Sequence, residues 1–366
     1  MPIYMDVHLV PGARAIEVAQ AHHLDLVHQT EFECNCMTYW VDEVKQTVFC
    51  LIEAPNKEAV ISMHNKSHGL IPHRIIEVQS SLIESFLGRI YDPADATFTE
   101  TGLKVFSESS FRILMLMKTI DPVLLKHQLG AVKTAELLSQ QNLIIRVSLQ
   151  EYGGREVEHP GSAFIASFDS ASKAVNCALA IVHEMKEAVG EATGFKMGIH
   201  AGEPVEKSEQ LFGDTLRMAD YIRSVAGNLQ VGITQAIKQL VAKDFFQKKE
   251  PAVFSLSIQD ENLLSGLCEQ LETNWREPEF NLENYCQAMA MSQSQLYRKT
   301  IALTGLSPNL LLKDFRLEKA KELMQKEHYN VSQVTFESGF SSPSYFTKCF
   351  KKKYGLLPMT YLDLLQ

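Results

Sequence analysis

The first 79 residues alternate short apolar segments of strand type and helix type. Strands are predicted at residues 3–10, 36–42, 47–53 and 74–78, and helices at residues 14–30 and 57–66. The pair Pro11-Gly12 predicts a turn between the first strand and the first helix. The resulting order, βαββαβ, favours a small ferredoxin-like α+β sandwich over residues 1–79.

Residues 111–258 predict a second domain of mixed α and β structure. The segment FRILMLM is a fully apolar strand, and helical periodicity follows it from residue 122 to 150. A hairpin is predicted over residues 153–168 and a helix over residues 172–188. Two strands, FKMGIHAG and LQVGIT, flank a helix at residues 214–226. Residues 80–110 are mixed in character, and we interpret them as a connector.

From residue 259 to residue 366 the pattern is helical only, which completes a multidomain α+β chain with an all-α end. Leu282, Cys286 and Met289 repeat on one face of a short helix. Ser292 is placed to cap the next helix, which Gly305 ends. A scaffold helix, a tight turn and a second helix with a polar outer face form a helix-turn-helix.

The same arrangement occurs a second time closer to the end of the chain. Val331, Val334 and Ser338 predict a helix, and Gly339-Phe340 predicts the turn after it. Ser342 is placed to cap a helix that begins with Pro343 and runs as PSYFTKCFKKKYG. A long helix starting at Ser307-Pro308 lies between the two units. It would hold two recognition helices about one duplex turn apart, roughly 34 Å.

Composition limits the remaining possibilities. The chain has 366 residues, 45% of them hydrophobic, which suits two or three globular domains. No run of 18 apolar residues occurs, and the start MPIYMDVHLVPG lacks the features of a signal peptide. The seven cysteines are scattered, as expected for reduced thiols. We therefore expect a cytoplasmic protein with no membrane partner.

The net charge of −9 is unevenly distributed along the chain. Residues 259–366 are nearly neutral, and within them residues 341–354 carry four lysines and no acid. A local cationic stripe of this kind is what contact with phosphates requires, whatever the charge of the whole chain. Lys353, one of these four, is equally well explained as solvated surface charge.

The C-terminal segments SQLYRK, TGLSP, RLEKAKELM, GFSSPSYF and FKKKYG together resemble the DNA-binding domain of the AraC family over about 85 positions. The resemblance implies two recognition helices in successive major grooves of promoter DNA. The DNA-contacting residues that it implies are Ser292, Ser294, Gln295, Tyr297, Arg298, Ser342, Ser344, Tyr345, Lys348, Lys351 and Lys352, the last two nearer phosphates. The alternative is an all-helical interaction domain with a solvated basic face.

The sequence departs from the AraC pattern at two positions. Ala290 stands where the family has a glycine in the turn, and Thr335 stands where it has a buried alanine. Both changes are mild, and we expect them to loosen the scaffold without removing the recognition helices.

The middle domain resembles class III nucleotide cyclases in the segments EYGGREVEHPGSAFIASFDSASKAVNCALAI, FKMGIHAGEPV and LFGDTLRMADYIRSVAG. That family binds two Mg²⁺ through two Asp residues and orients its substrate with an Asn and an Arg. At these four positions the chain carries Lys118, Ser162, Arg217 and Tyr221. We therefore expect a pseudo-cyclase with no enzymatic activity. The alternative is an active nucleotide cyclase with an accessory DNA-binding module.

The resemblance also implies a role for the middle domain without catalysis. The cyclase fold is normally a dimer, so the expected partner is a second copy of the chain, a homodimer through this domain. Lys118, Arg217 and Arg155 would also suit an anionic ligand such as a nucleotide effector. Structural or surface charge is the preferred explanation for each of these three residues.

The N-terminal segments MDVHLVPG, VAQAHHLDL, YWVDEVKQTVFCLIEAP and MHNKSHGLIP resemble a small family of ferredoxin-like nickel-binding proteins of bacteria. Seven of the twelve histidines lie in the first 79 residues. His64 and His68 are spaced to share one helix face, while His8 lies on the first strand and His22 on the first helix. Imidazole nitrogen suits Ni²⁺, Zn²⁺ or Cu²⁺, and only the resemblance selects nickel. The alternative to metal binding is that these four histidines are polar residues packed within the fold.

Other potential ligands in this domain carry less weight. Cys50 lies on a strand that the topology places beside the first strand. Cys34 and Cys36 alternate on a strand and would either ligate a metal or pack in the core.

These features together favour a ligand-responsive, sequence-specific DNA-binding transcription regulator. In this hypothesis the N-terminal domain senses a metal or another ligand, the inactive cyclase-like domain dimerises or senses, and the C-terminal domain binds a promoter. Metal storage is a third possibility, and it is less favoured because it would not require two helix-turn-helix units.

Overall fold

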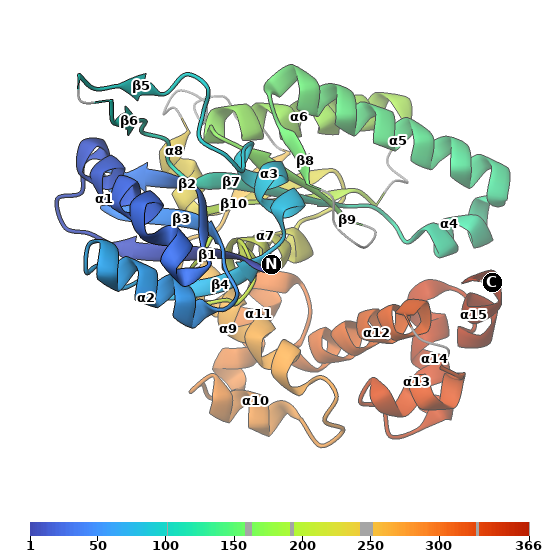
Figure 1. The fold of residues 1–366 in the computed structure, drawn as a ribbon. Helices are drawn as coiled ribbons and strands as arrows, with labels where there is room; N and C mark the ends of the chain where they lie inside the picture. Colours follow the sequence, from blue (N-terminus) through green and yellow to red (C-terminus); the bar gives the residue numbers. More distant parts are fainter. Residues whose placement is uncertain (101, 158–162, 191–193, 242–251, 327–328, 366) are drawn as a thin grey trace.

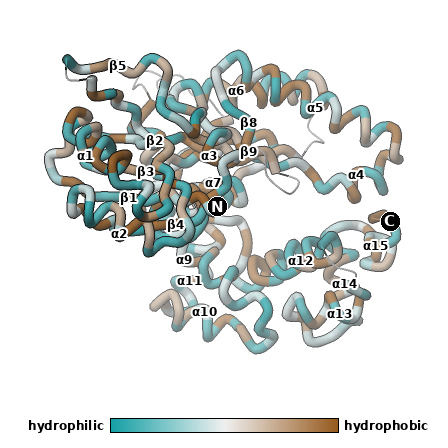
Figure 2. Tube along the Cα trace, in the orientation of Figure 1, coloured by the Kyte–Doolittle hydropathy of each residue, from teal (hydrophilic) through white to brown (hydrophobic). Residues whose placement is uncertain are grey.

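The computed structural model describes residues 1–366 except residues 101, 158–162, 191–193, 242–251, 327–328 and 366. The two larger sheets pack one face against the other, and the C-terminal helices extend away from them on one side of the molecule (Figure 1). The helices around the sheets alternate between hydrophobic and hydrophilic residues along their length, as amphipathic elements do (Figure 2).

The N-terminal sheet has the strand order β2-β3-β1-β4, with every neighbouring pair antiparallel. This order and the βαββαβ succession confirm the expected ferredoxin-like sandwich. Its elements are β1 (Ile3–Leu9), α1 (Ala15–His28), the 3-10 turn η1 (Gln29–Phe32), β2 (Asn35–Asp42), β3 (Thr47–Glu53), α2 (Lys57–Ser67) and β4 (Arg74–Val78).

Both faces of the N-terminal sheet are buried. Alternation along β1 turns Tyr4 toward α1 and α2, whereas Met5 and Val7 point to the opposite side. The second face packs against residues of the middle domain such as Leu114 and Phe212, in one continuous apolar cluster. The N-terminal domain is thus joined to the middle domain through its sheet.

The expected connector contains ordered elements: α3 (Ser80–Leu87), β5 (Thr97–Phe98) and β6 (Lys104–Val105). Phe86 and Leu87 of α3 are buried in the apolar cluster between the two sheets. Arg89 donates hydrogen bonds to Glu108 (2.6 Å) and to the carbonyl oxygen of Tyr39 (2.6 Å). α3 is therefore packed between the two domains, whereas β5 is exposed.

The middle sheet has the order β12-β11-β10-β7-β9-β8, with β10–β11 and β11–β12 parallel and the other pairs antiparallel. Its elements are β7 (Arg112–Lys118), α4 (Pro122–Leu129), α5 (Ala131–Tyr152), β8 (Arg155–Val157), β9 (Ala163–Phe168), α6 (Ala171–Ala188), β10 (Lys196–Gly202), α7 (Gly213–Val225), β11 (Gln230–Ile233), α8 (Gln235–Leu240) and β12 (Val253–Ser255).

One prediction for this domain is wrong in detail. The helical periodicity over residues 122–150 does not form one helix, because the chain breaks at Gly130 (φ +81°, ψ +164°). This left-handed φ favours glycine and separates α4 from α5. The break allows α4 to leave the sheet and to approach the C-terminal helices (Figure 1).

The two faces of the middle sheet are also covered within the chain. α5 and α6 cover one face, where Ile145, Ile181 and Met185 are fully buried. On the other face, Leu114, Leu116 and Ile165 share a cluster with the N-terminal domain and with Ala219 of α7. A homodimer of this domain would therefore have to use outer helix surfaces or the edge strands β8 and β12.

The described C-terminal residues form helices only, as expected. These are α9 (Ile258–Asn274), α10 (Leu282–Ala288), α11 (Gln293–Thr304), α12 (Pro308–Lys326), α13 (Val331–Glu337), α14 (Pro343–Tyr354) and α15 (Pro358–Leu365). Within the residues that the structure describes, no helix is both long and apolar enough to cross a membrane.

Candidate nucleic-acid interface and candidate metal centre

The first helix-turn-helix unit (residues 282–304) consists of α10 and α11. Ser292 caps α11 in a capping box: its hydroxyl accepts from the amide of Gln295, and the Gln295 side chain accepts from the amide of Ser292 (3.2 Å). Leu296 and Thr300 point inward and are fully buried. Ser294, Tyr297 and Arg298 are exposed on the outer face. Two of the five expected DNA-contacting residues here, Ser292 and Gln295, also hold the helix start.

The turn of the first unit contains a residue under strain. Ala290 adopts φ +49°, the left-handed conformation that favours glycine. An L-residue with a Cβ pays about 1–2 kcal/mol for this conformation. The departure from the family glycine at this position therefore has a cost in stability, while the fold of the turn is kept.

The second helix-turn-helix unit (residues 331–354) consists of α13 and α14. Ser342 caps α14, and Pro343 occupies its first turn, as expected. Phe346 and Phe350 are fully buried. The remaining expected DNA-contacting residues are exposed on α14: Ser344, Tyr345, Lys348, Lys351 and Lys352.

Two further positions of the second unit have clear structural roles. Thr335 is fully buried, and its hydroxyl donates to the carbonyl oxygen of Val331 (2.8 Å), so the polar atom that replaces a family alanine is satisfied. Lys353 is half-buried and lies 3.5 Å from Asp314 and 3.4 Å from Glu318. It is thus part of an ion-pair network, and the interpretation as freely solvated charge is wrong.

The candidate metal centre lies between the N-terminal sheet and its two helices, and His64 is at its middle. The His64 side chain is completely buried, with Nε2 2.8 Å from Asp6 Oδ2 and Nδ1 3.1 Å from Asp25 Oδ1. His68 lies 3.1 Å from the same Nδ1, and its Nε2 is 3.3 Å from Asp25. The helix spacing i, i+4 thus brings His64 and His68 together, as expected.

His8 and Cys50 complete a second group around His64. Strand alternation points Asp6 and His8 to the same side of β1, and Cys50 is the partner of Asp6 in the register of β1 with β3. Donor atoms of Asp6, His8, Cys50 and His64 lie within 4.8 Å of one another, and the same holds for Asp25, His64 and His68. His64 belongs to both groups.

The electrostatics of the cluster are dominated by its two carboxylates. Burial by itself lowers the pKa of His64, but Asp6 and Asp25 outweigh it and raise that pKa to about 10. Burial by itself raises the pKa of Asp25, but the hydrogen bonds and charges of His64 and His68 outweigh it and lower that pKa to about 2. Burial raises the pKa of the Cys50 thiol, and Asp6 adds to this effect. With Asp6 and Asp25 ionised and His64 protonated, these three groups keep one net negative charge, and a metal ion would have to displace the His64 proton to bind its ring.

The other expected ligand, His22, lies in neither group. It is buried on α1, with its ring 5.1 Å from that of Tyr39, and burial lowers its pKa. Asp6 and Asp25 were missed by the sequence-based prediction, which considered only histidine and cysteine. The signal for Asp6 was available, because it is two residues from His8 on a strand.

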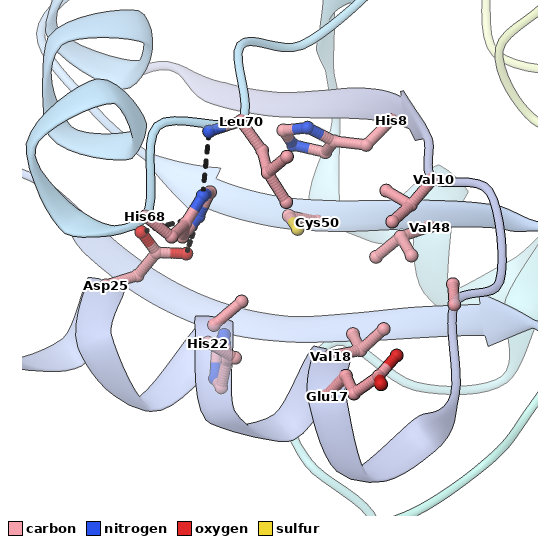
Figure 3. A pocket seen from close by; sticks show the side chains of 12 residues that line it. His8, Val10, Glu17, Val18, His22, Asp25, Val48, Cys50, His68 and Leu70 are labelled. Carbon is pink, nitrogen blue, oxygen red and sulfur yellow. Dashed lines mark hydrogen bonds and ion pairs between the residues drawn. The ribbon is translucent and has the colours of Figure 1, made fainter.

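A cavity of about 80 Å³ opens beside the cluster (Figure 3). Its lining includes the polar residues His8, His22, Asp25, Cys50 and His68 and the valines Val10, Val18 and Val48. Neither ring nitrogen of the buried His8 makes a hydrogen bond with any described residue, although Nε2 is 3.4 Å from Asp6. Buried polar atoms are rarely left without a partner. This orphaned imidazole and the mixed N, O and S donor set fit a divalent transition metal.

Of the four positions assigned to the cyclase chemistry, Arg217 and Tyr221 make contacts within the chain. Lys118 ends β7, opposite Ala163 and Lys196 in the register of the sheet. Arg217 forms an ion pair with Asp214, and Tyr221 is buried in a cluster with residues of α9. Ser162 lies outside the described residues.

Residues 285–363 match the sequence family described as Helix-turn-helix domain, and residues 4–78 match Nickel responsive protein SCO4226-like. These matches confirm the resemblance of the C-terminal domain to AraC-type DNA-binding domains and that of the N-terminal domain to ferredoxin-like nickel-responsive proteins. Each match covers less than half of the chain.

Two curated proteins are similar to part of the chain. Histidine kinase P4 of Formosa agariphila is 33% identical over 30% of this chain and 8% of its own length. HTH-type transcriptional regulator MtrA of Neisseria gonorrhoeae is 35% identical over 23% of this chain and 28% of its own length. The chain thus spans less than a third of either relative.

Two solved structures show similarity to other parts of the chain. SCO4226 from Streptomyces coelicolor is 32% identical, covering 21% of this chain and 94% of that one, with a TM-score of 0.20. The catalytic core of a rhodopsin-guanylyl cyclase with ATPαS is 18% identical, covering 37% of this chain and 82% of that one, with a TM-score of 0.31. Similarities at these TM-scores do not bear on function.

Proposed function

We propose that this protein is a sequence-specific DNA-binding transcription regulator that responds to a transition metal bound in its N-terminal domain. The observation that carries the proposal is the pair of helix-turn-helix units, each with a well-capped second helix and an exposed polar face. α12 joins the units over 19 residues, about 28 Å of helix. This length suits two recognition helices in successive major grooves, whose spacing is roughly 34 Å.

The metal would be held by His64 together with Asp6, His8 and Cys50, or with Asp25 and His68. Nickel is the preferred ion because of the family match of residues 4–78, and zinc or copper would suit the same donors. A bound ion would supply positive charge between the two carboxylates. One ring nitrogen of His64 would bind the ion in place of its present carboxylate partner, and the carboxylate at the other nitrogen, Asp6 or Asp25, would orient the ring.

We further propose that the middle domain is not catalytic and serves as a scaffold that connects the N-terminal metal-binding domain to the C-terminal DNA-binding domain. In support, Arg217 and Tyr221 are occupied by contacts within the chain, and Lys118 stands where a metal-binding carboxylate is needed. The competing function is a nucleotide cyclase with an accessory DNA-binding module. Turnover of ATP or GTP to the cyclic nucleotide with Mn²⁺ or Mg²⁺ would establish that alternative.

The test of the regulator function combines metal analysis with DNA binding. Duplexes that bind tightly are first selected from a random pool, and affinity for them is then measured with nickel and with a chelator. We expect bound metal in the purified protein and at least a fivefold change in affinity on chelation, about 1 kcal/mol of coupling.

The double variant H64A/H68A should lose both the metal and this response. The matched control is H23A/H183A, because both of these histidines are exposed and neither lies in the cluster. A metal response that persists in H64A/H68A would place the signal elsewhere. Equal binding to selected and random duplexes would contradict the regulator function itself.

A further inference from the structure

The second helix-turn-helix unit is attached to the middle domain through α4. Leu124 of α4 is buried in the same apolar cluster as Phe346, Phe350 and Tyr361 of the C-terminal helices. Lys126 adds a hydrogen bond to the carbonyl oxygen of Leu364 (3.3 Å). Because α4 is separated from α5 by the break at Gly130, it forms an arm between the sheet and this unit (Figure 1).

A buried carboxylate lies at the base of this arm. Asp121 caps α4 by accepting from the amide of Val123 (2.9 Å) through Oδ1. Its other oxygen accepts from the hydroxyl of Tyr361 (2.7 Å) and pairs with Lys321 of α12 (3.2 Å). Only 7% of the Asp121 side chain is exposed, so these contacts are made largely out of water.

Polar contacts continue from Asp121 to the recognition helix α14. Lys321 pairs with Glu318 (3.1 Å), which accepts from the hydroxyl of Tyr354 (2.8 Å) and pairs with Lys353 (3.4 Å). Tyr354 and Lys353 form the last turn of α14. Asp121, although it belongs to the middle domain, is thus linked to the second recognition helix by a chain of three polar contacts, through Lys321 and Glu318.

The first helix-turn-helix unit is attached at a different place. Leu264 and Cys268 of α9 pack against Tyr221 and Ile222 of α7, and Leu303 of α11 contacts the same cluster. α12 is in turn attached to the end of α9, where Arg316 donates to the carbonyl oxygen of Trp275 (2.9 Å). Both helix-turn-helix units are therefore attached to the middle domain, in addition to being joined to each other by α12.

We propose that Asp121 is a positioning residue that sets the distance and angle of the second recognition helix relative to the first. The middle domain then defines which spacing of two half-sites the protein accepts. This inference rests on the proposed DNA-binding function. Adding one base pair between half-sites shifts the second groove by about 3.4 Å and rotates it by about 35°. A unit held by Asp121 cannot follow this displacement, whereas a released unit can.

The experiment uses the full chain and a selected duplex in which the half-sites are separated by the selected distance or by one additional base pair. Wild type should bind the longer duplex about tenfold more weakly. D121N and Y361F should retain the affinity for the selected spacing within about threefold and lose most of this discrimination. Asparagine caps helices as well as aspartate does, so α4 keeps its start in D121N.

The matched control is D363N, which removes the same charge from an exposed position on α15. It should discriminate between spacings as wild type does. Equal weakening at every spacing in D121N and Y361F would show a merely structural role and overturn the proposal. Stronger binding at every spacing would indicate that α4 hinders DNA binding, which also overturns it. Absence of any sequence preference in wild type would instead remove the proposed function on which it rests.

Discussion

The two helix-turn-helix units share one motif and differ in their turns and outer faces. The first turn holds Ala290 at φ +49°, and the second holds Gly339 at φ +75°. The outer face of α11 exposes Ser294, Tyr297 and Arg298, whereas α14 exposes three lysines. Because lysines mainly contact phosphates, the comparison suggests different roles for the two units. The first unit would contribute more to base selection, and the second more to attraction of the phosphate backbone.

The turns also differ in their surroundings. A Cβ at Gly339 would overlap the carbonyl oxygen of Trp275, which Arg316 holds in place. Ala290, by contrast, already carries a Cβ, so its cost is conformational only. The same turn is thus tolerant of a side chain in the first unit and intolerant in the second.

The largest effect on this comparison is expected from G339A. The substitution combines an unfavourable φ with a backbone overlap, and it should destabilise the second unit by about 3 kcal/mol. Amide hydrogen exchange in α13 and α14 measures this loss. Unchanged protection of these amides would contradict the close packing of the turn on Trp275.

The next largest effect is expected from R298A. Loss of a side chain that reads a base edge should cost about 2 kcal/mol on the selected duplex and abolish base preference at one half-site. Binding to a panel of duplexes with single base changes in each half-site checks both parts. An equal loss on random DNA would assign Arg298 to phosphate contact instead.

A smaller effect is expected from K351A. Removal of one phosphate contact should weaken binding to all duplexes alike and reduce the slope of log K against log salt concentration by about 0.9. Titrations at several salt concentrations measure the slope. K186A is the control, since Lys186 is exposed on α6 of the middle domain. A changed base preference in K351A would contradict the assignment of Lys351 to phosphate contact.

The smallest effect, of opposite sign, is expected from A290G. Glycine adopts the left-handed conformation without the Cβ penalty, so the first unit should gain about 1 kcal/mol. Hydrogen exchange in α10 and α11 detects the gain. A loss of protection would mean that the Ala290 methyl group contributes packing that outweighs the backbone strain.

Local signals in the sequence predicted most of the fold. Period-two and period-3.6 patterns placed the strands and helices, and Ser292, Ser342 and Gly305 gave the helix ends by their own chemistry. The helical pattern over residues 122–150 failed at Gly130 because one glycine weighs little in a pattern, while its φ depends on where the neighbouring helices pack.

The candidate metal centre was predicted only in part. The spacing of His64 and His68 was sufficient to pair them, since both lie on one helix. Asp6 could have been found from its spacing to His8 on one strand, and Cys50 was placed beside that strand by the topology. Asp25 comes from another helix, and no local pattern reports its proximity to His64 and His68. His22 lines the cavity beside the cluster and packs against Tyr39, yet it belongs to neither donor group.

The sequence by itself determined the elements, the two terminal family resemblances and the residues exposed on the recognition helices, because each depends on contacts within a few turns of chain. Only the tertiary structure decided what the elements are attached to. The covered faces of both sheets, the burial of Tyr221 under α9 and the contact of Asp121 with Tyr361 join residues far apart in the sequence. Such contacts depend on how whole apolar faces pack together, and packing is a property of the assembled fold.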